Sequence, residues 1–294
     1  MTAHLDARQG TGTVLRCAGR AVARYVHRPE LPPEVSPRPY LHPVRTLGGA
    51  VVTELMPVDH LHHLGVSLAV PDVSGANFWG GRTYVRDQGP TELDNHGRQL
   101  HLGWRRRTSG HLREDLGWQD RAGRRLLGEE RELAARPLSD TAWLLELRST
   151  LHNTSGAPLS LGSPATNGRP GAGYGGWFWR APATSRDLLV RTADGEGEQA
   201  AHGSRSRWLA LAGTDPNGLD WTVLLVHDGT DPWFLRVAEY PGVGCSLAWE
   251  QRLPVLPGAP VVRRIAAVVA DGRLTRAQAS ALAEDPRLRV VADG

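Results

Sequence analysis

The sequence contains no lysine, and all 34 of its basic residues are arginine. Without lysine the chain cannot form a Schiff base with pyridoxal phosphate or a carbonyl substrate, and it lacks the lysine of a phosphate-binding P-loop. Arginine does not replace lysine in these reactions, because its guanidinium group stays protonated. These enzyme classes are therefore excluded.

Cysteine and long apolar runs are also scarce. The two cysteines, Cys17 and Cys245, lie far apart and match no metal-binding or redox spacing. No stretch approaches the roughly 18 consecutive apolar residues of a membrane span. Residues 1–10 contain no apolar segment of the kind found in signal peptides. We therefore expect a cytoplasmic protein with no membrane partner.

Positive charge is present but is spread along the chain. The formal net charge is +3, and the tightest basic cluster is Arg105, Arg106 and Arg107. Domains that bind nucleic acid concentrate their basic residues on one face or along one helix. We therefore expect no nucleic-acid partner.

Apolar residues alternate with polar ones along much of the chain, which is typical of half-buried β-strands. In residues 141–151 (TAWLLELRSTL), Trp143, Leu145 and Leu147 share one face. The same pattern predicts strands at residues 14–24, 124–134, 188–191, 208–212, 221–227, 234–239, 246–253 and 260–270, with a hairpin turn at the Asp-Pro-Asn-Gly of residues 215–218. One helix is predicted at residues 276–283, capped by Thr275.

Many short strands with a single helix predict an all-β fold. Apolar residues make up 40% of the chain, which is enough for a packed core, and no composition shift indicates a linker. We predict a single domain over residues 1–294, a large antiparallel β-sandwich with one short C-terminal helix. Residues 1–10 and 288–294 are expected to fray.

The segment PVDHLHHLG (57–65) holds the densest group of chemically active side chains. If the segment is extended, His60 and His62 share one face, whereas Asp59 and His63 share the other. Imidazole titrates near neutrality and suits proton transfer, and it is also a common ligand of divalent metals. Because a strand aims only two of these histidines together, a metal site would need a distant third ligand such as His42. We favour acid–base chemistry without a metal, and a divalent metal bound by the three histidines remains the alternative.

Two segments combine aromatic residues with glycine. NFWGGR (77–82) contains Asn77, Trp79 and Arg82, and GAGYGGWFWR (171–180) contains Tyr174 and Trp177. Aromatic faces stack on sugar rings, arginine and asparagine bond hydroxyl groups, and glycine lets backbone approach a ligand closely. These segments predict a site for a small carbohydrate, although a tightly packed turn with core aromatics is the alternative.

Glu250 follows the apolar run CSLAW and falls in a predicted strand. Burial there would raise the pKa of its carboxyl group toward neutrality, as a general base requires. We predict that Glu250 and at least two of the histidines line one pocket on the concave face of the larger sheet.

Part of the chain resembles the galactose mutarotase-like superfamily of large β-sandwiches. The resemblance rests on LRSTLHNTSGAPLSL (147–161), on CSLAWEQRLP (245–254), and on Leu-Pro-Gly (256–258) with the strand that follows. It implies the supersandwich fold and a catalytic role for Glu250. The catalytic histidine of mutarotases has no counterpart, because residues 162–165 read Gly-Ser-Pro-Ala. His62 or His63 would then supply the missing acid.

Residues 39–272 more closely resemble a bacterial family labelled DUF6807 or methane oxygenase PmoA-like. The segments RPYLHPVRT (38–46), DHLHHLG (59–65), NFWGGRTYV (77–85) and GAGYGGWFW (171–179) carry this resemblance. His42 and Arg45, in the first of them, are assigned to the ligand site. Members are often encoded near sugar oxidoreductases of the Gfo/Idh/MocA type, which implies a functional link to such an enzyme.

These observations lead to a carbohydrate-active protein, most simply an epimerase, hydrolase or lyase that acts on a sugar or keto-sugar. Glu250, His62 and His63 are the predicted acid–base residues. His60, Asp59, Arg82, Trp79, Asn77, Tyr174, Trp177, His42 and Arg45 are the predicted ligand-binding residues, and no cofactor is expected. The alternatives are a non-catalytic sugar-binding accessory protein and a metal-dependent oxygenase.

Overall fold

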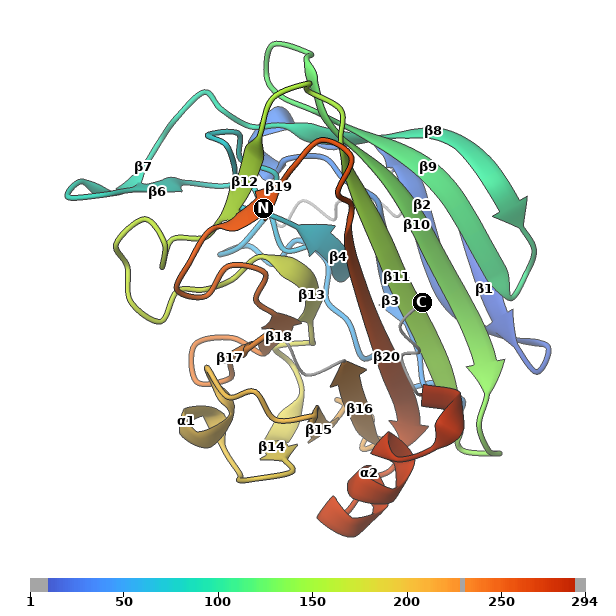
Figure 1. The fold of residues 1–294 in the computed structure, drawn as a ribbon. Coiled ribbons are helices and arrows are strands. Elements are labelled where there is room, and N and C mark those ends of the chain that lie inside the picture. The colour runs from blue at the N-terminus through green and yellow to red at the C-terminus, as the bar shows by residue number, and fades with distance from the viewer. Residues whose placement is uncertain (1–9, 228–230, 289–294) are drawn as a thin grey trace, which may run out of the picture.

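Two large antiparallel sheets form the body of the molecule. The computed structural model describes residues 10–227 and 231–288. The first sheet has seven strands, in the order β1 (Gly10–Cys17), β2 (Arg20–Pro29), β3 (Tyr40–Val44), β4 (Val66–Ala69), β13 (Gly176–Arg180), β18 (Gly242–Cys245) and β17 (Trp233–Arg236). The second has eight, in the order β14 (Arg186–Thr192), β15 (Trp208–Thr214), β16 (Asp220–His227), β20 (Val261–Asp271), β11 (Ala142–Asn153), β10 (Arg125–Pro137), β9 (His111–Gln119) and β8 (Arg98–Arg107). The two sheets pack face to face, which confirms the predicted all-β sandwich (Figure 1).

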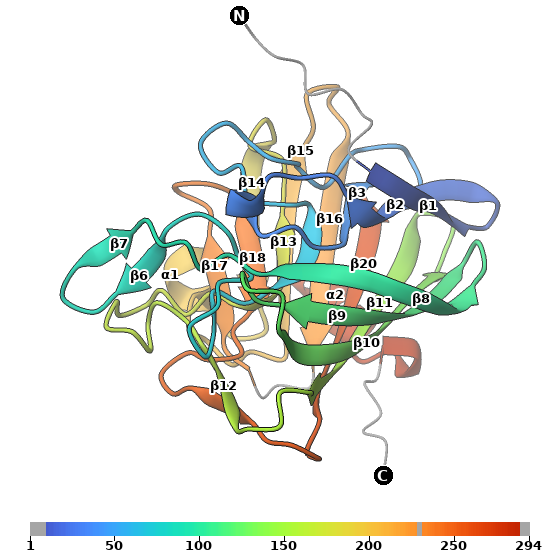
Figure 2. The ribbon, with the colours of Figure 1, turned by 90° about the horizontal axis from the view of Figure 1, so that it is seen from above.

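Three smaller features extend from this sandwich. A three-stranded sheet joins β19 (Leu253–Val255), β12 (Leu159–Gly162) and β5 (Asp72–Val73). The hairpin of β6 (Thr83–Val85) and β7 (Gly89–Thr91) projects away from the body (Figure 2). The helical segments are α1 (Glu198–Ala201), α2 (Arg276–Ala283) and the 3-10 turns η1 (Pro33–Val35) and η2 (Pro286–Leu288). None of the helices in the described ranges is long and apolar enough to cross a membrane.

The core lies between the sheets and follows from the period-two pattern. Trp143, Leu145 and Leu147 of β11 point inward and are almost fully buried. Leu144 points to the outer face, where α2 covers it with Ala279 and Ala283. The helix begins as predicted, because Thr275 and Gln278 form a reciprocal capping box.

Several strand boundaries differ from those predicted. Residues 14–24 form a hairpin instead of one strand, because Ala18 and Gly19 turn the chain with φ angles of 48° and 80°. Residues 246–252 follow bends instead of a strand, and β17 ends at Arg236. The unpredicted strands include β3, β4, β8, β9, β13 and β18. In β8 the reason is that this polar edge strand shows no clean alternation of buried and exposed residues. Most of the termini predicted to fray lie outside the described residues, although Gly10 begins β1 and Leu288 is buried.

Candidate functional site

The histidine-rich segment forms two consecutive tight turns. The backbone N–H of His60 donates to the carbonyl of Pro57 at 2.8 Å, and that of His63 donates to the carbonyl of His60 at 2.9 Å. The ring centroids lie 4.5 Å apart for His60 and His63, 4.8 Å for His62 and His63, and 5.8 Å for His60 and His62. The prediction of an extended segment with histidines on opposite faces is therefore wrong, because the turns bring all three imidazoles together.

The NFWGGR segment packs against these turns. The Oδ1 atom of Asn77 accepts hydrogen bonds from the backbone N–H groups of Trp79 at 2.8 Å and Gly80 at 2.9 Å. Gly80 has a φ angle of 100°, and a Cβ atom there would lie 2.6 Å from the Cβ atom of His62. The close approach that glycine permits is thus to His62. Asn77 is buried and holds the turn, so its predicted role in contacting a ligand is wrong.

A cleft of about 290 Å³ opens beside the histidines. The predicted residues that line it are Asp59, His60, His62, His63, Trp79, Arg82 and Tyr174, and the others are Gly80, Pro90, Arg169, Ala172, Phe234, Arg236, Glu239 and Tyr240. A second hollow, of about 200 Å³, lies over β10, β11 and β20, and neither histidine nor an aromatic residue lines it. The cleft beside the histidines gathers chemically active side chains from all three of the segments 57–65, 77–82 and 171–180, and it is therefore the candidate functional site.

The cleft lies on the outer face of the seven-stranded sheet. Strand β13 shows why, because its side chains alternate between the two faces. Phe178 contacts the ring of His63, with centroids 5.1 Å apart, and belongs to the apolar cluster beside the cleft. Trp177 and Trp179 belong to the core between the sheets. The predicted position on the concave face of the larger sheet is wrong.

Aromatic rings form the wall of the cleft. The ring of Trp79 lies 4.7 Å from that of Tyr174 and 5.0 Å from that of Phe178, measured between centroids. The ring of Tyr240 lies 4.7 Å from that of His60 and 5.0 Å from that of His63. The wall is therefore a packed set of aromatic rings, in which Trp79 and Phe178 are almost fully buried.

Burial keeps most of these rings neutral. It lowers the pKa of His62 to about 3 and lowers that of His63 further. It also raises the pKa of Tyr174 to about 12 and raises that of Tyr240. At neutral pH these groups present uncharged N–H and O–H donors. The Nδ1 atom of His63 is buried and has no hydrogen-bond partner among the described residues.

Asp59 and His60 form a dyad at the rim of the cleft. The Oδ2 atom of Asp59 lies 2.8 Å from the Nδ1 atom of His60. This hydrogen bond lowers the pKa of Asp59, so its carboxylate stays ionised. Because the carboxylate accepts the hydrogen bond, the ring proton of a neutral His60 lies on Nδ1. The Nε2 atom of a neutral His60 then carries the free lone pair, as a general base requires.

Glu250 is outside the cleft. It is exposed and lies in the bends that follow β18, and it does not line the cleft. The chain turns here because the indole of Trp249 packs on Gly173 and Gly203, which leaves the next side chain in solvent. The prediction that Glu250 is a buried, strand-borne carboxylate sharing the pocket of the histidines is wrong.

Three further predicted residues do not line the cleft. Trp177 lies on the core side of β13, under the guanidinium of Arg131 at 5.2 Å from the ring centroid. The Nδ1 atom of His42 lies 3.0 Å from Thr53 Oγ1, so this ring is engaged away from the cleft. Arg45 is exposed and donates to the carbonyl of Gly49 at 3.3 Å. Each has a structural partner elsewhere.

The three clustered imidazoles do not fit a three-histidine metal centre. The rings of His60 and His63 are stacked, with an interplanar angle of 21°. Nitrogen lone pairs lie in the ring plane, so stacked rings do not aim them at one point. In residues 10–227 and 231–288 no group of three or more His, Cys, Asp or Glu side chains is placed to hold a metal ion.

Sequence reasoning missed the residues that close the far side of the cleft, chiefly Arg169, Arg236, Glu239 and Tyr240. Arg169 lies two residues before the GAGYGGWFWR segment, Arg236 and Glu239 fall within the segment predicted as a strand at residues 234–239, and Tyr240 follows that segment.

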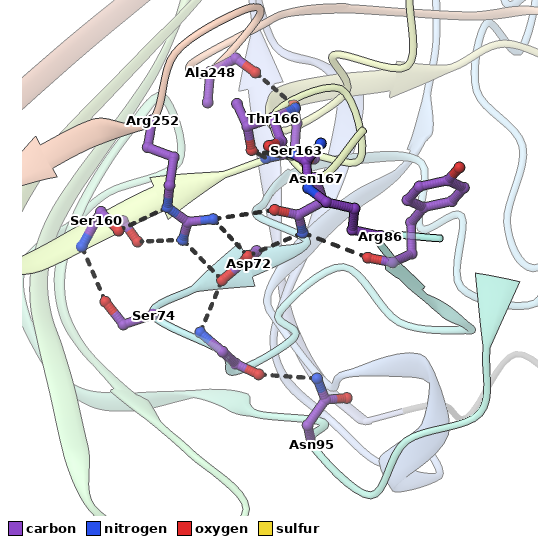
Figure 3. Close-up of polar contacts among 12 residues, drawn as sticks. Asp72, Ser74, Arg86, Asn95, Ser160, Ser163, Thr166, Asn167, Ala248 and Arg252 are labelled. Atoms are coloured by element: carbon purple, nitrogen blue, oxygen red, sulfur yellow. Dashed lines mark hydrogen bonds and ion pairs between the residues drawn. The ribbon is translucent and has the colours of Figure 1, made fainter. Parts of the chain in front are cut away.

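A polar network fixes the loop that carries Arg169 and Tyr174 (Figure 3). Arg252 forms a two-bond ion pair with Asp72, at 2.7 and 3.0 Å, and its Nε atom donates to Ser160 Oγ at 2.8 Å. Asn167 donates to the same carboxylate of Asp72 at 3.1 Å. The network thereby joins the three-stranded sheet to the loop that lines the cleft.

Comparison with known proteins gives the chain a family. No curated protein matches the sequence. Among solved structures, a heparinase III with methylated lysines aligns with 60% of this chain and 22% of its own, at 8% identity and a TM-score of 0.25. The aligned part thus spans less than a quarter of that protein, and a likeness at this level carries no functional argument. The model of DUF6807, a family of unknown function, matches residues 12–284, and the chain therefore belongs to this family.

Proposed function

We propose that the protein is a carbohydrate-active enzyme whose cleft binds a small sugar or keto-sugar and moves a proton on it. The observation that carries this proposal is the convergence of three histidines, Trp79 and two tyrosines around one cleft of about 290 Å³. Aromatic faces with polar edges complement the apolar faces and equatorial hydroxyls of a sugar ring. A cleft of this size suits a ligand of one or two rings.

In this proposal His60 is the general base. Its Nε2 lone pair removes a proton from the carbon next to a keto group, and the C–H electron pair forms an enediolate. Delivery of a proton from water to the opposite face gives the epimer, the imidazolium of His60 releases its proton to solvent, and the step needs no oxidant. Asp59 holds the tautomer and stabilises the imidazolium that forms. His62 and His63 would donate hydrogen bonds to the substrate, and Glu250 takes no part.

A keto-sugar substrate has to come from an enzyme that oxidises a sugar hydroxyl group. An oxidoreductase of the Gfo/Idh/MocA type catalyses that class of reaction. We therefore propose such an enzyme as the functional partner.

The experiment is a ligand-observed NMR screen of the purified protein against sugars and 3-keto-sugars, followed by time courses that detect turnover. We expect His60→Ala to lower turnover by about 10² or more, as for loss of a general base. His152→Ala, which alters an exposed histidine on β11, is the control and should leave turnover unchanged. Binding without turnover would support a non-catalytic sugar-binding protein, and failure of every sugar to bind would refute the proposal.

A further inference from the structure

A buried cation lies directly beneath the inner end of the cleft. The side chain of Arg38 is almost completely buried, and its guanidinium donates to the carbonyls of His62 at 2.7 Å and Trp79 at 2.9 Å. Its remaining hydrogen bonds go to Ser67 Oγ and to the carbonyls of Val35 and Ser36. All of these acceptors are neutral. Among the residues that the structure describes, Arg38 has no carboxylate partner.

An uncompensated charge in a low-dielectric environment acts over a longer distance than a charge in water. Although burial lowers the pKa of Arg38 to about 9, the group stays charged at neutral pH. Its field reaches the cleft, since the charge of Arg38 also lowers the pKa of His62. The inner end of the cleft, between His62, His63 and Trp79, therefore has a positive potential.

The other charges of the cleft are at its rim, and they are divided between the two signs. Arg82 pairs with Glu92 at 2.9 Å, and Arg236 lies 3.8 Å from Glu198. Arg169 has no carboxylate partner within the described ranges, and the rim carboxylates Asp59 and Glu239 face solvent. The charge of Asp59 opposes this field at His62, but the charge of Arg38 has the larger effect on the pKa of His62.

We propose that the ligand of this cleft carries a carboxylate, as a uronic acid does, and that the carboxylate binds at the inner end above Arg38. The inference rests on the proposed function and narrows its substrate class. Neutral N–H donors of His62 and His63 would bond the carboxylate oxygens, and the orphaned Nδ1 atom of His63 would gain a partner. The ring hydroxyls would face Asp59 and Glu239 at the rim.

A carboxylate fits this end better than a phosphate does. Phosphate sites usually present several cationic side chains or backbone N–H groups directly to the ligand. Here the cation acts from behind two backbone carbonyls, and the direct donors are neutral imidazoles. The arrangement therefore suits a single negative charge.

The test compares ligands that differ in charge but hardly in shape. Isothermal titration calorimetry would measure binding of D-glucuronate and D-galacturonate, of their uncharged uronamides, of glucose and of glucose 6-phosphate. We expect at least one uronate to bind about tenfold or more tightly than its own amide. Equal or tighter binding of the amides overturns the inference but leaves the proposed function standing. Tighter binding of the sugar phosphate also overturns it, and absence of all binding refutes both proposals.

Variants then locate the charge that is responsible. Arg38→Gln should abolish the preference for uronate over uronamide, and Arg38→Lys should retain part of it. Arg106→Gln, which removes an exposed arginine of β8, is the control and should change neither affinity. Circular dichroism would check that the variants fold. If Arg38→Gln does not fold, the ligand pairs on the unaltered protein still decide the inference.

Discussion

Replacing Gly80 by alanine tests how closely the NFWGGR turn packs against His62. An added Cβ atom would lie 2.6 Å from His62 Cβ and 2.7 Å from the backbone carbonyl of Val35. Backbone atoms cannot move aside as the end of a flexible side chain can. The alanine would therefore push the histidine turn away from the cleft wall.

The expected cost has two parts. Gly80 has a φ angle of 100°, and an L-residue in this region costs about 1–2 kcal/mol. Overlap with packed neighbours costs a further 1–3 kcal/mol or so. The variant should therefore lose about 2–5 kcal/mol in its free energy of unfolding.

Gly75 provides a matched control, because its φ angle is 97° and an added Cβ atom would meet nothing within 4 Å. Gly75→Ala should thus lose only the conformational part, about 1–2 kcal/mol. Urea unfolding followed by circular dichroism measures both free energies. Equal losses in the two variants would show that contact with His62 contributes nothing and would refute the reasoning.

Three further predictions concern the residues around the cleft. Arg252→Met should lower the free energy of unfolding by about 2–3 kcal/mol, because it leaves the carboxylate of Asp72 without its ion-pair partner. The double variant that also carries Asp72→Asn should recover part of this loss, and urea unfolding would measure both. The pKa of His62 is about 3 in the folded state and ordinarily 6.5. Below about pH 6.5 His62 therefore takes up a proton in the unfolded chain but not in the folded state, and the contribution of His62 to stability falls by about 1.4 kcal/mol per pH unit between roughly pH 6 and 4. Unfolding measured across this range should show a shallower fall for His62→Gln, and an unchanged slope would contradict the assignment. Trp79→Leu should weaken sugar binding about tenfold through lost stacking. Trp177→Leu should lower the free energy of unfolding and leave the affinity for the sugar unchanged. Equal affinities of the two variants in calorimetry would show that Trp79 does not contact the ligand.

The fold class could be predicted because it depends on a local signal. In β11 the inward positions of Trp143, Leu145 and Leu147 follow from a two-residue period that burial on one side imposes. The helix cap at Thr275 is equally local. Strand β8 escaped prediction because nearly all of its residues are at least partly exposed, so burial on one face imposes no alternation.

The site was predicted in composition but not in geometry. Residues near one another in sequence, such as His60, His62 and His63, could be assigned together, but their convergence depends on turns that the sequence does not mark. Glu250 was misassigned because an apolar run before a carboxylate is equally compatible with a bend anchored by Trp249. Tyr240 was missed because contact between β17–β18 and the histidine turns is long-range.

The arginines of β8 have a consequence for the protein in solution. Strand β8 pairs with β9 on one side and forms an edge of the eight-stranded sheet (Figure 1). Arg105, Arg106 and Arg107 are exposed along this edge, and two register shifts interrupt the pairing with β9. A strand from another copy would have to desolvate three guanidinium groups and follow an irregular edge. The cluster thus disfavours pairing of a further strand at this edge of the sheet.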